Sequence, residues 1–207
     1  MPGIGAALAG VGAPILVFLV WMYFSPWNTD VGYAPLQPVP YSHKLHAGLL
    51  GMDCRYCHQA VEKGPHAAIP TNQTCMNCHS QIKTDSDVLQ KIRDGYATDT
   101  PVEWVKVHLL PDFAYFTHAV HLNAGVGCVS CHGRIDEMEV VRQVKPLSMG
   151  WCLECHRNPA AHIRPEDVRS TDMAYLDLPL EQRIQNGNAR IAAQKINPPT
   201  HCSACHR

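Results

Sequence analysis

Cysteine and histidine recur together in this sequence, in five places with one spacing. The ten cysteines form five Cys-x-x-Cys pairs, and a histidine directly follows every pair. Two thiols three residues apart, followed by an imidazole, are the attachment pattern of c-type haem, in which the thiols become thioethers and the histidine ligates the iron. We therefore predict five covalently bound haem c groups, with thioethers on Cys54, Cys57, Cys75, Cys78, Cys128, Cys131, Cys152, Cys155, Cys202 and Cys205 and proximal ligands at His58, His79, His132, His156 and His206.

Other uses of paired cysteines explain this pattern less well. A zinc ribbon needs two Cys-x-x-Cys pairs and has no use for a histidine after each one. A redox-active pair would occur once, beside a strand–helix pattern. The net charge of −1 and the lack of a basic run argue against nucleic acid as a partner.

Thirteen histidines minus five proximal ligands leave eight that could close the sixth position of an iron. Two parts of the chain open with an aromatic residue, Ser or Thr, and then His-x-x-His, so the two histidines share one helix face. We expect the first of each pair to ligate the haem of its own unit and the second to reach a neighbouring haem. The distal candidates are His43, His46, His118, His121, His66 and His108, with Met149 as the one well-placed thioether.

The paired histidines reveal an internal repeat of about forty residues. Each copy holds the His-x-x-His pair followed by two Cys-x-x-Cys-His motifs, and the second histidine precedes the first motif by eight residues in one copy and by seven in the other. We predict six segments: a transmembrane anchor at 1–28, a proline-rich linker at 29–40, two-haem modules at 41–80 and 115–157, a connecting segment at 81–114, and a wrapping segment with the fifth haem at 158–207.

The haems must supply the core of such a chain. Five haems among roughly 175 residues leave about 35 residues each, too few for an ordinary apolar core. We therefore predict a mostly α and irregular multihaem cytochrome c fold, with a haem-packed core and little sheet. Within it, sequence signals predict a short helix that stops at Gly95, an extended segment over 102–108 and a helix over 180–195.

The N-terminal segment has no charged side chain before Asp30. Its apolar run, Ile4 to Phe24, has the length of one membrane-spanning helix, and aromatic residues follow at its end. A cleaved signal peptide is the alternative, but no basic residue precedes the run. We predict a retained single-pass anchor in the cytoplasmic (inner) membrane, contacting lipid, with the haem domain on the periplasmic or outer face.

Several motifs resemble the pentahaem cytochrome subunit of bacterial alternative complex III, with its class III-like haem modules. They are Tyr-Ser-His-x-x-His-Ala-Gly, Cys-Arg-Tyr-Cys-His, Thr-Cys-Met-Asn-Cys-His, Pro-Asp-Phe-x-Tyr-Phe-x-His-x-x-His and Met-Gly-Trp-Cys-Leu-Glu-Cys-His. The resemblance implies a quinol:electron-acceptor oxidoreductase, with polytopic quinol-binding membrane subunits, an iron–sulfur subunit and a monohaem cytochrome c subunit as partners.

Taken together, these features predict an electron wire that catalyses no bond chemistry of its own. The first alternative is a quinol dehydrogenase cytochrome that feeds a periplasmic reductase. The second is a multihaem enzyme, which would need one five-coordinate iron, and the surplus of histidines argues against it.

Overall fold

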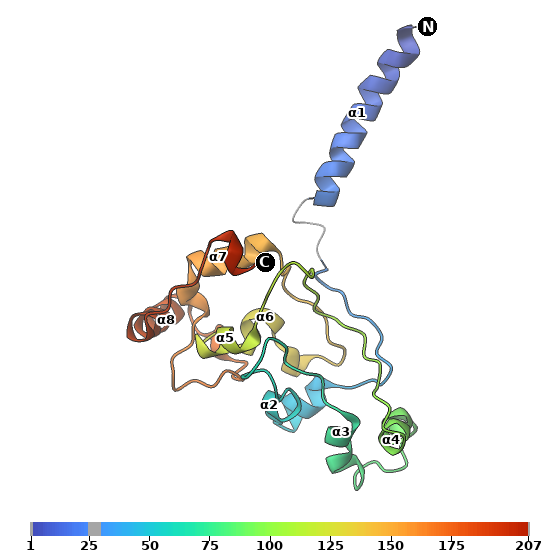
Figure 1. Ribbon diagram of the computed structural model, residues 1–207, viewed down its shortest axis with the longest axis vertical. Coiled ribbons are helices and arrows are strands. Elements are labelled where there is room, and N and C mark those ends of the chain that lie inside the picture. The colour runs from blue at the N-terminus through green and yellow to red at the C-terminus, as the bar shows by residue number, and fades with distance from the viewer. Residues whose placement is uncertain (1, 25–29, 207) are drawn as a thin grey trace.

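The computed structural model describes residues 2–24 and 30–206, so residues 1, 25–29 and 207 of the predicted anchor, linker and wrapping segment lie outside the described residues. Short helices joined by irregular chain make up the described part, as predicted (Figure 1). The helices are α1 (Pro2–Phe24), η1 (Lys44–Leu49), α2 (Cys54–Cys57), α3 (Asn72–His79), η2 (Asp87–Leu89), α4 (Gln90–Ala97), α5 (His118–Asn123), α6 (Cys128–His132), η3 (Ile135–Glu137), α7 (Met149–Arg157), η4 (Pro159–His162), η5 (Tyr175–Asp177), α8 (Leu180–Gln194) and η6 (Cys202–Ala204).

The predicted membrane-spanning helix is wrong. No helix among the described residues is both long and apolar enough to cross a membrane. The predicted single-pass location in the inner membrane, with the haem domain on its outer face, rested on that helix and is withdrawn with it.

Sheet structure is nearly absent from the described chain, as predicted. It consists of one isolated antiparallel bridge between Val126 and Ile163. The segment predicted to be extended, 102–108, is irregular and pairs with no strand. Instead the Gln37 amide bonds both backbone groups of Val105, at 2.9 Å each, which satisfies the polar atoms that a neighbouring strand would have satisfied.

The buried apolar core is small. Its main cluster joins Val39, Ile92 and Val102, from the proline-rich segment, α4 and the connecting segment. Ile92 comes from the predicted short helix, but that helix ends at Ala97 and not at Gly95. A Cβ at Gly95 would clash with Asn72 of α3, so the glycine serves close helix packing and does not act as a stop signal. Nine described hydrophobic side chains are buried, few for this length, as expected if cofactors fill the interior: Val39, Val61, Ile92, Val102, Leu122, Val129, Met138, Ile163 and Tyr175.

The C-terminal part contains the predicted long helix. Helix α8 runs from Leu180 to Gln194, which confirms the predicted range of 180–195. It packs against η4 so closely that Gly187 lies against the backbone of Ala160. The Arg183 guanidinium reinforces this contact by donating to the Ala161 carbonyl at 3.1 Å.

The repeat is visible in the backbone, and its unequal spacing has a local explanation. The second copy forms an ordinary α-helix, α5, whereas the first forms the π-helix η1 at the same place. A π-turn holds one more residue than an α-turn, and Leu50 N–H accordingly bonds the Leu45 carbonyl five residues back at 2.9 Å. The extra residue of the first copy is thus accommodated in the helix without moving its two histidines apart.

Candidate haem sites

Each Cys-x-x-Cys pair starts or lies within one helical turn. The pairs in α2, α3, α6 and α7 are α-helical (Figure 1), and the last pair begins in η6, with Cys205 directly after its end. Residues three apart share a helix face, so one turn presents both thiols to one side. Local caps start two of these turns: Asp53 accepts from the Arg55 N–H at 2.9 Å, and the Ser148 hydroxyl accepts from the Trp151 N–H at 3.4 Å.

The cysteines are available for thioether bonds. All ten are free thiols, so no disulfide uses them. Within the described ranges, no three His, Cys, Asp or Glu side chains gather as a site for a single metal ion. The donor set therefore fits covalent haem, which needs two thiols and one imidazole at each motif.

Three histidine pairs have the spacing that a shared iron requires. Metal–imidazole bonds are about 2.0–2.1 Å long, so two imidazoles on opposite sides of one metal ion have ring centroids about 6.3 Å apart. The observed centroid distances are 6.3 Å for His46 with His79, 6.5 Å for His118 with His132, and 6.0 Å for His121 with His156. In each of these pairs, one histidine belongs to the His-x-x-His pair that opens a repeat and the other to a Cys-x-x-Cys-His motif. The ligand roles themselves stay predictions.

His43 has the same place in the first repeat as His118 in the second, and it lies near His58. Burial, followed by the nearby His58 and His46, lowers the pKa of His43 to about 4. A neutral imidazole is the form that ligates a metal. Burial likewise lowers the pKa values of His121 and His132, in the latter to about 3, so all three are neutral at physiological pH.

The aromatic residue that opens each repeat has a role that the sequence did not disclose. Tyr41 lies edge-on to His43 at 4.8 Å and nearly parallel to His46 at 4.5 Å. Phe116 repeats this arrangement in the second copy, against His118 at 4.8 Å and His121 at 4.5 Å. One ring thus separates and orients both histidines of a pair. The sequence signal that could have indicated this role is the recurrence of an aromatic residue at the same position in both repeats.

Most of these imidazoles are held through their Nδ1 atom. An Nδ1–H bond to a carbonyl fixes the tautomer and ring orientation and leaves Nε2 for a metal. Among the motif histidines, the bonds join His58 to Ala68 (2.7 Å), His79 to Ile82 (3.0 Å), His156 to Pro199 (2.6 Å) and His206 to Phe113 (3.0 Å). Among the paired histidines, they join His46 to Ser42 (2.9 Å), His118 to Pro65 (2.7 Å) and His121 to Thr117 (2.8 Å).

The remaining distal candidates are less well placed. His66 is exposed, and Met149 is 65% exposed at the start of α7. The ring of His108 lies 4.5 Å from that of His132, which is too close for an iron between them. The sixth iron ligand of the haem predicted at Cys202, Cys205 and His206 therefore stays unassigned.

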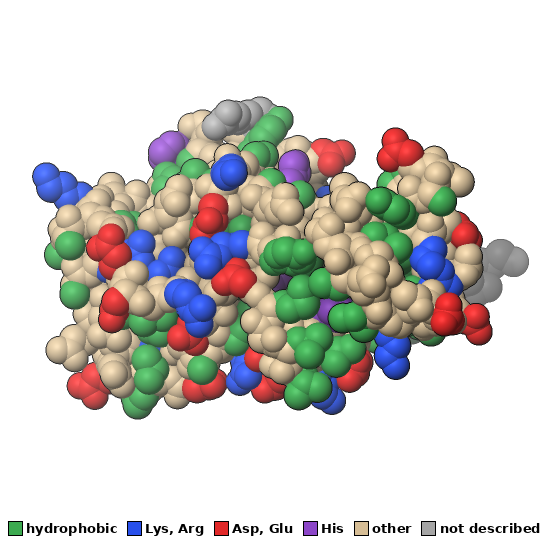
Figure 2. Space-filling view, turned by 90° about the horizontal axis from the view of Figure 1, so that it is seen from below, with side chains coloured by type: hydrophobic (Ala, Val, Ile, Leu, Met, Phe, Trp, Pro, Cys, Tyr) green, Lys and Arg blue, Asp and Glu red, His purple; other side chains and the backbone are tan. Residues whose placement is uncertain are grey.

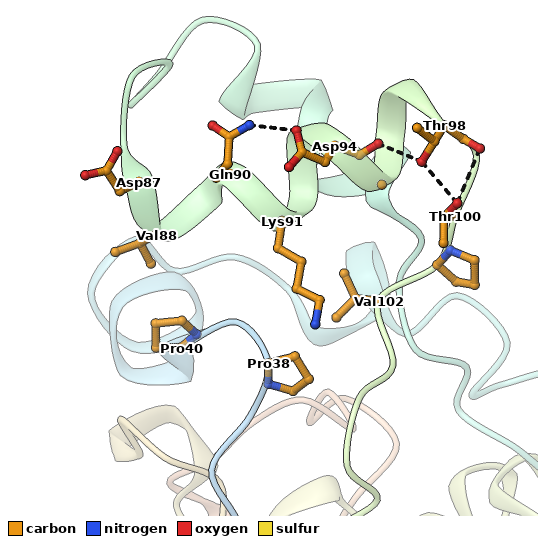
Figure 3. Close-up of a pocket in the computed structure, with 12 residues that line it drawn as sticks. Pro38, Pro40, Asp87, Val88, Gln90, Lys91, Asp94, Thr98, Thr100 and Val102 are labelled. Atoms are coloured by element: carbon orange, nitrogen blue, oxygen red, sulfur yellow. Dashed lines mark hydrogen bonds between the residues drawn. The ribbon is translucent and has the colours of Figure 1, made fainter.

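The surface carries mixed charge (Figure 2) and a hollow that lies apart from the haem motifs. Figure 2 shows acidic and basic side chains interspersed on one face, in keeping with the net charge of −1. One hollow lies between the proline-rich segment, α4 and residues 98–102, with Lys91 extending toward Pro38 (Figure 3). None of its lining residues belongs to a Cys-x-x-Cys-His motif.

Comparison with known proteins agrees with the donor set. The profile of a family described as cytochrome c7 and related cytochrome c matches residues 39–94 and 114–207. The chain is also 31% identical over 130 residues to a protein of Nitratidesulfovibrio vulgaris strain Hildenborough, named menaquinone reductase, multiheme cytochrome c subunit. This match covers 62% of the chain and 59% of the relative, less than two thirds of the relative's length.

The family match covers most of the chain, including all five motifs. Cytochromes of type c hold their haem through thioether bonds to such motifs, so haem c is covalently bound here. The chain therefore belongs to the family of cytochrome c7 and related c-type cytochromes.

Proposed function

We propose that this cytochrome carries five haem c groups in one continuous series and works as an electron wire. Each bound haem would supply a one-electron Fe(III)/Fe(II) couple, and the protein's part is to hold the couples close together and set their potentials. The observation that supports this proposal is that thiols of different motifs lie next to one another in a linear order.

The neighbouring thiols can be followed from one motif to the next. Cys57 has Cys75 and Cys78 beside it, and these thiols add to burial in raising its pKa. The Cys54 and Cys128 thiols interact, which lowers the pKa of Cys54 and raises that of Cys128, although 74 positions separate them in the sequence (128 − 54). Cys131 lies near Cys155 and Cys152, and Cys152 near Cys205.

These contacts place the five motifs in a spatial series. Named by their motif histidines, the series runs His79, His58, His132, His156 and His206. Each thiol marks the edge of the haem that it would bind, so adjacent thiols bring haem edges together. The two repeats meet through Cys54 and Cys128, and the fifth motif extends the second repeat. No site is bypassed in this order, which favours conduction along the chain.

We further propose that the wire exchanges electrons with a quinone-reactive complex. The motif resemblance to alternative complex III and the relative named as a menaquinone reductase subunit both support this partner class. In the first case electrons would pass from quinol-oxidising membrane subunits, through an iron–sulfur subunit, to this chain and on to a monohaem cytochrome or a downstream carrier.

A quinol dehydrogenase cytochrome that feeds a periplasmic reductase is the second candidate. The relative named as a menaquinone reductase subunit also supports this candidate, because its name likewise refers to a quinone. The two candidates differ in whether this chain reacts with quinol alone.

The test combines haem content with quinol reactivity. Mass spectrometry of the purified chain should show five haems, with one on each Cys-x-x-Cys-His peptide. Mixed with a quinol analogue in the absence of other subunits, the chain should stay oxidised, and it should become reduced once quinol-oxidising subunits are added. Reduction by quinol without partners would select the dehydrogenase instead, and fewer than five haems would refute the continuous wire.

A further inference from the structure

His132 differs from the other four motif histidines in how its ring is held. The Nδ1 atoms of His58, His79, His156 and His206 each bond a backbone carbonyl at 2.6–3.0 Å. His132 Nδ1 is buried and has no hydrogen-bond partner within the described residues. Something other than a carbonyl must therefore hold this ring.

The ring of His108 packs directly against the His132 ring. Its ring lies edge-to-face on the His132 ring, with the centroids 4.5 Å apart and the planes at 77°. His108 Nε2 is also buried and, within the described residues, also without a partner. The connecting segment between the two repeats thus supplies an imidazole contact to a ring that no carbonyl holds within the described residues.

The spacing separates this role from ligation. Two imidazoles across one iron need centroids about 6.3 Å apart, from metal–nitrogen bonds of about 2.0–2.1 Å. His118 meets that requirement, at 6.5 Å from His132 with planes only 9° apart, whereas His108 does not.

We propose that His108 is a positioning residue: it packs on the His132 ring and sets the ring plane, and it does not ligate iron. This inference rests on the proposed role of His132 as an iron ligand. Removal of the His108 ring would free the His132 ring to turn about its bond to the metal. Supporting groups of this kind tune the ligand and its metal. Because the His132 site is central in the proposed series, its potential affects transfer in both directions.

The test compares two holo-protein variants, His108→Ala and His108→Phe. Nearly parallel imidazole planes give a ferric haem a rhombic low-spin EPR signal, whereas crossed planes give a signal with a much larger maximal g value. In His108→Ala the rhombic signal of one haem should be lost and replaced by a low-spin signal of the other type, with a shift in the midpoint potential of that haem alone. His108→Phe keeps the ring contact and should keep the rhombic signal.

A matched control and the contrary outcomes make the result decisive. Leu109→Ala changes an exposed neighbour and should leave all signals in place. If His108→Ala turns one haem high-spin, His108 is an iron ligand; if neither variant changes the EPR spectrum or the potentials, it positions nothing. Peptide mass spectrometry on the Cys128–Cys131 segment separately tests whether a haem is attached beside His132, as the proposed wire requires. A missing haem there would overturn the proposed wire.

Discussion

Replacing His46 by alanine is expected to free the sixth position of one specific haem. The His46 ring stands 6.3 Å from that of His79, with Nδ1 held by the Ser42 carbonyl at 2.9 Å. His46→Ala removes the whole ring and leaves a methyl group too short to reach a metal. The haem attached at Cys75 and Cys78 should therefore lose its distal ligand while keeping its covalent bonds.

The size of the effect follows from the number of sites. One haem in five, or about 20% of the total, should change from low-spin to high-spin, because loss of a strong axial ligand weakens the ligand field. His121→Ala should give a second signal of equal size, since His121 faces His156 at 6.0 Å. The double variant should show about two fifths, because distant independent sites add.

Quantitative EPR and optical spectroscopy of the ferric protein measure these fractions. Added imidazole should refill the vacant position and restore the low-spin spectrum, which separates ligand loss from unfolding. Lys44→Ala, an exposed change in the same helical turn, is the matched control and should have no effect on spin state.

Two results would refute this reasoning. If His46→Ala stays fully low-spin with five haems attached, His46 is not a ligand and the centroid spacing has been misread. If the haem that becomes high-spin is the one at His58, the second histidine of the pair serves the first haem motif of its repeat and not the second.

The remaining predictions concern stability. Gly187→Ala should destabilise the holo-protein by about 1–3 kcal/mol, because the new methyl group meets the Ala160 backbone, and thermal unfolding should show a lower Tm. Ile92→Ala should cost about 2–5 kcal/mol, since this side chain is 2% exposed; an unchanged denaturation midpoint would show that the small core contributes little. Hydrogen bonds from Arg55 lower the pKa of Asp53 from 3.8 to about 2, so the ion pair stabilises the fold above pH about 4 and loses that effect as the pH falls toward 2. Asp53→Asn should be less stable than the parent at pH 6, and the difference in Tm should disappear as the pH approaches 2.

Local chemistry was readable from the sequence alone. A thioether pair and its proximal histidine lie within five consecutive residues, so spacing identifies each haem motif without knowledge of the fold. The repeat followed from the recurrence of these motifs, the lack of sheet from the few residues available per haem, and the helix at 180–195 from its local sequence pattern. The unequal spacing before the first motif was also visible, although its form as a π-turn at Lys44–Leu49 was not.

The N-terminal prediction was wrong despite an unambiguous composition. Apolar residues from Ile4 to Phe24 predict a membrane crossing by count, but no helix among the described residues meets the requirement of length and apolarity together. A count of apolar residues therefore does not suffice to predict a membrane crossing.

Only the tertiary structure decided which sites are neighbours. Cys54 and Cys128 meet across two repeats, and His108 reaches His132 from the connecting segment. Such contacts depend on how separate short helices pack, and no residue pattern near either partner encodes them. The sequence determined what each site binds, because thioether and imidazole chemistry is local; the fold determined the order of the sites and the setting of each imidazole, because adjacency is a property of the packed chain.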